Sequence, residues 1–190
     1  MLAAVDTAAE MLSMGLGLPR NLFTDMMKYA PHLLAPTGSD LNKYTEGTIF
    51  AGFHYDLNFI TIHGKSRFPG LMAWTKNGKR IKVAVPDGHL LLQAGKMLEH
   101  ITGGDISAGF HEVLFTPDTA SAVELAREAN RSLWRVSSTL FGHIRSDVVL
   151  EPLEKFRNEE SVAKYPAINT GDFVMEELKA ISLVVQPQGK

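Results

Sequence analysis

Two side chains that can bind a metal stand two residues apart in the segment His54-Tyr55-Asp56. Side chains at i and i+2 of an extended strand project to the same face, so this imidazole and this carboxylate can reach one metal ion together. Two ligands leave such a site incomplete. His111, which lies 55 residues after Asp56 on an apolar segment expected to be a strand, is the best candidate for the third ligand.

Two imidazoles and one carboxylate on one face of an octahedron leave three positions free for a cosubstrate and O₂. This is the ligand set of non-haem Fe(II) oxygenases. Zinc more often takes a closed tetrahedral site, or three protein ligands and a water. The pattern His-x-Asp is common by chance, however, so the alternative of incidental polar residues on a surface strand stays open at this point.

A second pair with the same spacing is Arg135 and Ser137. On a strand these two side chains share a face, and a guanidinium beside a hydroxyl suits the remote carboxylate of a bound acid. The alternative is a salt bridge that faces solvent. Four other histidines have no comparable pattern, and we expect them to lie on the surface or to be hydrogen-bonded within the protein: His63, His89, His100 and His143.

The composition limits the classes of protein to which the chain can belong. Because it has no cysteine, disulfides, thiol nucleophiles and Cys-ligated zinc or Fe–S clusters are excluded. A net charge of −2 offers no basic field for nucleic acid or anionic lipid. The apolar runs are too short to span a bilayer and the first residues do not resemble a secretory signal. We therefore expect a cytoplasmic protein without nucleic-acid or membrane partners, and its oligomeric state stays open.

The elements that position these residues follow from local patterns along the 190 residues. A capping box at 7–10 predicts one helix, residues 22–29 predict another, and a loop is expected at 36–40. Short β-like runs separated by turn signals then predict a sandwich or barrel: 48–53, 58–63, 71–75, 80–85, 89–94 and 109–115. The remaining predictions are a helix at 117–129, a strand at 133–141, a helix from Asp172 to about Ile181, and a frayed tail at 186–190.

A series of motifs between residues 47 and 153 follows a known order. The series contains a glycine-containing approach to His-x-Asp (47–56), a strand (58–63), Pro69-Gly70-Leu71, the segments 86–88 and 93–104, the distal His111, Arg135-Val136-Ser137, and the stretches 141–147 and 150–153. In these motifs the chain resembles the C-terminal catalytic half of the isopenicillin N synthase-like Fe(II)/2-oxoglutarate-dependent dioxygenases. So many matches in the family's order form a specific signal.

This resemblance implies a mainly β fold, a double-stranded β-helix (jelly roll) with flanking α-helices. It implies that His54, Asp56 and His111 are catalytic and hold Fe(II), and that Arg135 and Ser137 bind the distal carboxylate of the cosubstrate 2-oxoglutarate. The implied activity oxidises a small organic substrate with O₂ and converts 2-oxoglutarate to succinate and CO₂. Two alternatives stay open: an Fe(II) oxidase of the isopenicillin N synthase type that uses no 2-oxoglutarate, and a non-catalytic, truncated jelly-roll binding protein.

The chain departs from the family pattern at four places, one of which is the gap of 24 residues between His111 and Arg135, longer than is usual in the family. Glu112 stands where the family usually has a basic residue, and the tyrosine expected upstream, which helps to hold the cosubstrate, is missing around 34–37. Gln93-Ala94-Gly95-Lys96 replaces the family's Asn-x-Gly-Asp turn. Because this strand faces the metal in the family, Gln93 is a candidate for the pocket wall.

The domain organisation that follows is a single domain of the Fe(II)/2-oxoglutarate dioxygenase type over residues 1–190. We expect a helical lead-in (1–43), a jelly-roll core (44–153) with a helical insert at about 117–130, and a helical tail (154–190). The family's usual N-terminal region is expected to be absent.

Overall fold

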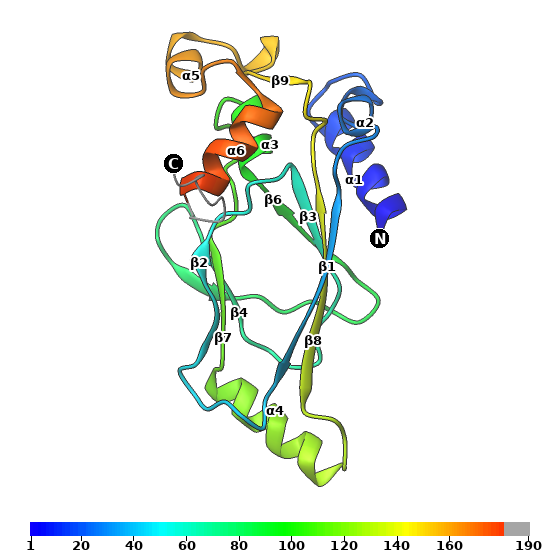
Figure 1. The fold of residues 1–190 in the computed structure, drawn as a ribbon, viewed down its shortest axis with the longest axis vertical. Coiled ribbons are helices and arrows are strands. Elements are labelled where there is room, and N and C mark those ends of the chain that lie inside the picture. The colour runs from blue at the N-terminus through cyan, green and yellow to red at the C-terminus, as the bar shows by residue number, and fades with distance from the viewer. Residues whose placement is uncertain (181–190) are drawn as a thin grey trace, which may run out of the picture.

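Two four-stranded antiparallel β-sheets face each other in the computed structural model, which describes residues 1–180, and helices surround them (Figure 1). One sheet has the strand order β1-β8-β3-β6 and the other has β2-β7-β4-β5. Most neighbours in each sheet are far apart in the sequence, which is the winding of a double-stranded β-helix, and the predicted fold class is confirmed. The strands are β1 (Leu33–Asp40), β2 (Ile49–His54), β3 (Ile60–His63), β4 (Leu71–Trp74), β5 (Arg80–Lys82), β6 (Leu91–Ala94), β7 (His111–Leu114) and β8 (Trp134–Gly142).

The larger hydrophobic core packs the sheet that contains β3 against three helices, α1 (Leu2–Gly15), α2 (Leu22–Met27) and α3 (Lys96–Ile101). Ile60 and Ile62 of β3 are buried in this core. Because side chains alternate along a strand, Thr61 and His63 point the other way, toward the second sheet. Burial of the two isoleucines on the helical side thus decides which side chains of β3 face the space between the sheets.

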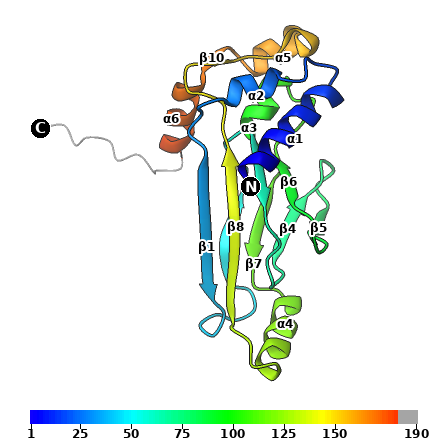
Figure 2. The same cartoon turned by 90° about the vertical axis from the view of Figure 1, so that its right-hand side faces the viewer.

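A smaller core closes the far end of the sheets beside α4 (Pro117–Glu128) (Figure 2), and its members are Leu41, Phe68, Phe115, Val123 and Leu133. Thr116 caps this helix, because its side chain accepts a hydrogen bond from the N–H of Thr119 while the Thr119 hydroxyl accepts one from the N–H of Thr116. Pro117 occupies the first turn, where a missing N–H costs nothing. The helix predicted at 117–129 is confirmed.

After β8 the chain forms short elements above the other end of the sheets (Figure 1). They are β9 (Val149–Leu150), a 3₁₀-helix (Glu154–Phe156), α5 (Glu159–Lys164), β10 (Ile168–Asn169) and α6 (Thr170–Ala180). α6 confirms the helix predicted from Asp172, whose expected last residue, Ile181, lies outside the described residues together with the tail at 186–190. The sequence does not predict α3 and α5, because six residues are too few for a helical period to show. No helix among residues 1–180 combines the length and apolarity that crossing a membrane requires.

Two features of the first 43 residues differ from the sequence prediction. β1 occupies the segment where we expected a loop, and it pairs with β8 along its whole length as the edge strand of the sheet. An edge position tolerates Pro36, and the polar residues around it hide the alternation that marks a strand. α1 begins at Leu2 rather than at Thr7, whose hydroxyl donates to the carbonyl of Ala3 within the helix. The lead-in is therefore not purely helical.

Candidate metal centre

The structure brings His54, Asp56 and His111 to one place. The two histidines are partners in the pairing of β2 with β7, and Asp56 follows β2 directly. Oδ1 of Asp56 lies 3.6 Å from Nε2 of His54 and 3.9 Å from Nε2 of His111. One ligand atom from each residue lies within 4.8 Å of the other two. This spacing suits a single cation between the three side chains, and the donor set is the one that Fe(II) accepts with positions left open.

Backbone carbonyl groups hold both imidazole rings in one orientation. Nδ1 of His54 lies 2.7 Å from the carbonyl oxygen of Gly52, and Nδ1 of His111 lies 3.0 Å from that of Gly109. When each Nδ1–H donates to this carbonyl, each Nε2 keeps its lone pair and faces Asp56. Such a second hydrogen bond fixes the tautomer and the ring plane of a metal-binding histidine.

The carboxylate of Asp56 is buried and held from one side. The Thr61 hydroxyl donates to its Oδ2 at 2.7 Å, and the amide of Gln93 donates to the same oxygen at 2.9 Å. These two bonds leave Oδ1 directed at the histidines. The amide nitrogen of Gln93 also lies 2.8 Å from Nδ1 of His111, so Gln93 touches two of the three candidate ligands.

The electrostatics of the three groups favour the forms that bind a cation. Burial alone raises the pKa of Asp56, but hydrogen bonds from His54 and Thr61 outweigh it and leave this pKa below its usual range. The hydrogen bond to Asp56 raises the pKa of His54, whereas burial lowers the pKa of His111. The site therefore offers a cation the carboxylate of Asp56 and the neutral imidazole of His111. A cation that binds His54 competes with a proton at the lower end of the pH range, because the pKa of His54 is raised.

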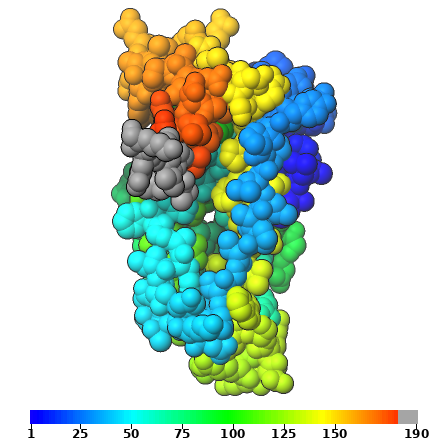
Figure 3. Space-filling view, in the orientation of Figure 1, coloured from blue at the N-terminus to red at the C-terminus, as the bar shows by residue number. Residues whose placement is uncertain are grey.

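A cavity of about 470 Å³ lies between the two sheets next to these residues. Figure 3 shows the opening between the segment that carries β2, in cyan, and the one that carries β1, in blue. Arg135 and Ser137 of β8 line the cavity, and they face Ser39 and Thr37 of the neighbouring β1. The two residues therefore share the inner face of their strand, as the sequence spacing predicts.

Arg135 is 9% exposed, and its Nε has no hydrogen-bond partner among the described residues. Within the same part of the chain it forms no salt bridge, although Lys65 pairs with Asp87 and Lys82 with Asp118. Burial lowers the pKa of the guanidinium, which still remains charged near neutrality because arginine starts so high. A buried cation without a protein anion beside a cavity calls for an anionic ligand, because an unpaired buried charge is costly.

Two residues near the metal centre, Thr61 and His63, have no functional role predicted from the sequence, and for a third, Gln93, the sequence predicts only a place in the pocket wall. Gln93 was a candidate for the pocket wall, and the structure places it on Asp56 and His111. Thr61 holds Asp56, and the alternation of β3 was the signal that could have placed it inside. His63 was expected to be a surface or internally paired histidine, but it lines the cavity and its buried Nε2 has no partner among the described residues.

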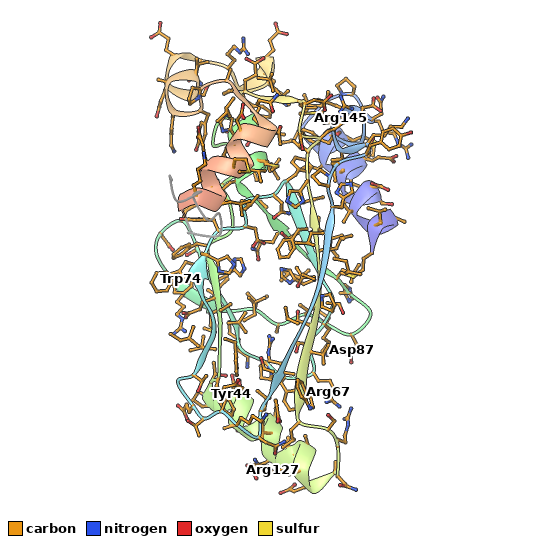
Figure 4. The ribbon with its side chains drawn as sticks, viewed as in Figure 1. Tyr44, Arg67, Trp74, Asp87, Arg127 and Arg145 are labelled. Atoms are coloured by element: carbon orange, nitrogen blue, oxygen red, sulfur yellow. The ribbon has the colours of Figure 1, made fainter. Side chains whose placement is uncertain are left out.

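A contact on the outer side of the sheet β2-β7-β4-β5 accounts for the acidic residue at position 112, where the family usually has a basic one. This buried carboxylate pairs with Arg80 of β5, so the basic residue comes from another strand of the same sheet, with β4 between, rather than from the next position in the sequence. Arg80 also lies over the ring of Trp74, which points away from the other sheet (Figure 4). These side chains are not among the residues that line the cavity.

Comparisons with known proteins agree with the fold and with the motifs. No family model matches the chain. Kihadalactone A synthase LFS from Citrus sinensis is 28% identical over 149 residues, which are 76% of this chain and 39% of that protein. A solved structure described as a 2OG-Fe(II) oxygenase family protein from Caulobacter crescentus superimposes with a TM-score of 0.74 at 23% identity, over 94% of this chain and 56% of that one.

The dioxygenase for auxin oxidation 1 from Arabidopsis thaliana, solved as a complex with 2-oxoglutarate, gives a TM-score of 0.66 at 21% identity. This match covers 83% of the present chain and 53% of the other. The chain spans less than half the length of the curated relatives that it matches. The resemblance predicted from the sequence motifs is confirmed: the chain is similar in sequence to plant enzymes such as the Citrus synthase, and in fold to Fe(II)/2-oxoglutarate-dependent oxygenases.

Proposed function

We propose that the chain carries the metal and cosubstrate sites of a non-haem Fe(II)- and 2-oxoglutarate-dependent oxygenase, an oxidoreductase that oxidises a small organic molecule with O₂. His54, Asp56 and His111 would hold Fe(II), and Arg135 with Ser137 would bind the distal carboxylate of 2-oxoglutarate. The observation that carries the proposal is the cavity itself. It joins three converging candidate ligands to a buried guanidinium that forms no salt bridge among residues 1–180.

In such a reaction the protein positions the metal ion and the acid and keeps water away from them. Iron and O₂ supply the oxidising chemistry, which converts 2-oxoglutarate to succinate and CO₂. Thr61 and Gln93 fix the carboxylate of Asp56, and the carbonyl groups of Gly52 and Gly109 fix the two rings. Arg135 then orients the acid by charge-assisted hydrogen bonds along the cavity floor.

A solved structure with the same fold is consistent with the proposed binding of 2-oxoglutarate. The auxin dioxygenase structure named above contains 2-oxoglutarate, and that protein shares the fold. A small organic substrate fits the enclosed site, and the net charge of −2 offers no surface field for nucleic acid. We propose the cytoplasm as the location, since a chain without cysteine gives no sign of an oxidising compartment.

The test is anaerobic titration of the metal-free protein with Fe(II) and then with 2-oxoglutarate, followed by addition of O₂. We expect a weak visible charge-transfer band from the chelated keto acid, then succinate. Arg135→Ala should abolish both while Fe(II) binding persists. Iron binding without the band, in the wild-type protein, would favour an Fe(II) oxidase that uses no 2-oxoglutarate. Binding of both ligands without O₂ consumption, whatever substrate is offered, would favour a non-catalytic binding protein.

A further inference from the structure

His63 lies in the middle of the cavity floor. On β3 it is opposite Thr139 of β8 on one side and Leu91 of β6 on the other. The preceding inward residue of β3 is Thr61, which holds Asp56 at the metal centre. The next inward residues of β8 beyond Thr139 are Ser137 and then Arg135.

The spacing of strands puts His63 between the two ends of the ligand site. Residues two apart on a strand are separated by about 7 Å, because each residue advances the chain by about 3.3–3.4 Å. The row of Thr61 and Gln93 is thus one such step from His63, and Ser137 is one step on the other side. His63 therefore lies between the metal centre and Arg135 along the floor of the cavity.

The two nitrogens of this ring have different surroundings. Nδ1 lies 3.2 Å from the Thr139 hydroxyl, which is itself buried. Nε2 is buried and has no hydrogen-bond partner among the described residues. When Thr139 donates to Nδ1, the proton of the ring stands on Nε2, which is then a donor without an acceptor among the described residues. Because most buried polar atoms in proteins have a hydrogen-bond partner, this unpaired donor is a candidate contact for a bound ligand.

We propose that His63 is a ligand-binding residue, whose Nε2–H donates a hydrogen bond to a carboxylate oxygen of the acid bound between the metal centre and Arg135. The proposal rests on the proposed function, because it takes 2-oxoglutarate as that acid. It gives the acid a third protein contact besides Arg135 and Ser137. Thr139 acts as the positioning residue that fixes which nitrogen carries the proton.

A different role, as a fourth metal ligand, is the main competitor. The ring centroids of His63 and His111 are 6.4 Å apart with nearly perpendicular planes. The group of side chains whose ligand atoms converge contains His54, Asp56 and His111 but not His63. The geometry therefore favours a contact to the acid over a contact to the metal.

The experiment measures two dissociation constants under argon: that of Fe(II) in the metal-free protein, and that of 2-oxoglutarate in the Fe(II)-loaded protein, from its visible band. His63→Leu removes the donor at similar volume, and His63→Gln restores a donor. We expect His63→Leu to weaken 2-oxoglutarate binding about tenfold, the effect of one buried hydrogen bond, with Fe(II) affinity unchanged. His63→Gln should recover most of the loss.

His89→Leu is the matched control, because this histidine is exposed and lies outside the residues that line the cavity. Thermal melts of each variant show whether it is folded. Unchanged 2-oxoglutarate affinity in folded His63→Leu overturns the proposal, and so does a loss of Fe(II) affinity without the acid, which would make His63 a metal ligand. If the wild-type protein binds Fe(II) but no 2-oxoglutarate, the proposed function fails first and this inference with it.

Discussion

Replacing the buried Arg135 by methionine should stabilise the protein when no ligand is bound. Nε of Arg135 has no hydrogen-bond partner among the described residues, and leaving such a group buried costs about 1–3 kcal/mol. Methionine has a similar length, no charge and enough flexibility to fill the same space. The gain of about 1–3 kcal/mol corresponds to a rise in Tm of about 2–12 °C for a chain of this size.

Addition of the ligands should remove or reverse this difference in stability. A ligand at one hundred times its Kd stabilises the folded state by about 2.7 kcal/mol. Only the wild-type protein can obtain this contribution from 2-oxoglutarate, because Arg135→Met lacks the cation that binds the distal carboxylate. With Fe(II) and saturating 2-oxoglutarate under argon, the wild-type protein should therefore melt close to or above the variant.

Differential scanning calorimetry of both proteins, with and without the two ligands, measures all four Tm values. Arg131→Met is the control for the loss of an exposed positive charge, and it should change stability by less than about 0.5 kcal/mol. A fall in the Tm of ligand-free Arg135→Met would refute the reasoning, because it would mean that the guanidinium stabilises the folded protein by itself.

Three further perturbations test the metal centre. Thr61→Val removes one of the two hydrogen bonds to Oδ2 of Asp56 and should weaken Fe(II) binding about 10-fold or more, measured by anaerobic titration; unchanged affinity would show that Gln93 alone holds the carboxylate. Lowering the pH from about 8 to about 6 should also weaken Fe(II) binding, because a proton competes for Nε2 of His54, whose pKa is raised by Asp56. In the metal-free protein, the raised pKa of His54 stabilises the folded state. This stabilisation is fully present below about pH 6.5 and is lost as the pH rises through the folded-state pKa. The Tm difference between the wild-type protein and His54→Ala should therefore shrink with rising pH. Gly95→Ala would place a Cβ 2.0 Å from the carbonyl oxygen of Asn58 and should unfold the segment that presents Asp56. In Gly109→Ala the atom nearest to the new Cβ, 2.9 Å away, belongs to the flexible Gln93 side chain, so this variant should be less destabilised. Equal melting curves for the two variants would contradict this reasoning.

The metal centre shows which part of a site local sequence can predict. His54 and Asp56 are recognisable because their spacing of two matches the period of a strand, and the same holds for Arg135 and Ser137. His111 is different, since no such spacing marks it. Its apolar, strand-like segment makes it a candidate, and the order of motifs along the family pattern supports the choice.

The residues that support the site depend on strand register, which short-range patterns do not contain. Gln93 reaches Asp56 because β6 pairs with β3 so that Gln93 is opposite Thr61. A shift of β6 by one residue along β3 would turn the Gln93 side chain to the helical side, away from Asp56. β1 was missed for a related reason: it is an edge strand whose polar residues face the cavity, so it has no apolar alternation to detect.

The placement of the two cores gives the reason for the polar interior. One core lies on the helical side of the sheet that contains β3, and the other closes the end near α4, so neither fills the space between the sheets beside the metal centre. His54 and His111 belong to one sheet, whereas Thr61 and Arg135 belong to the other. A metal ion and an acid bound there would connect the two sheets where apolar packing does not. Ligand binding should therefore protect the amides of β2 and β7 from hydrogen exchange more than those of β3, which the larger core already holds.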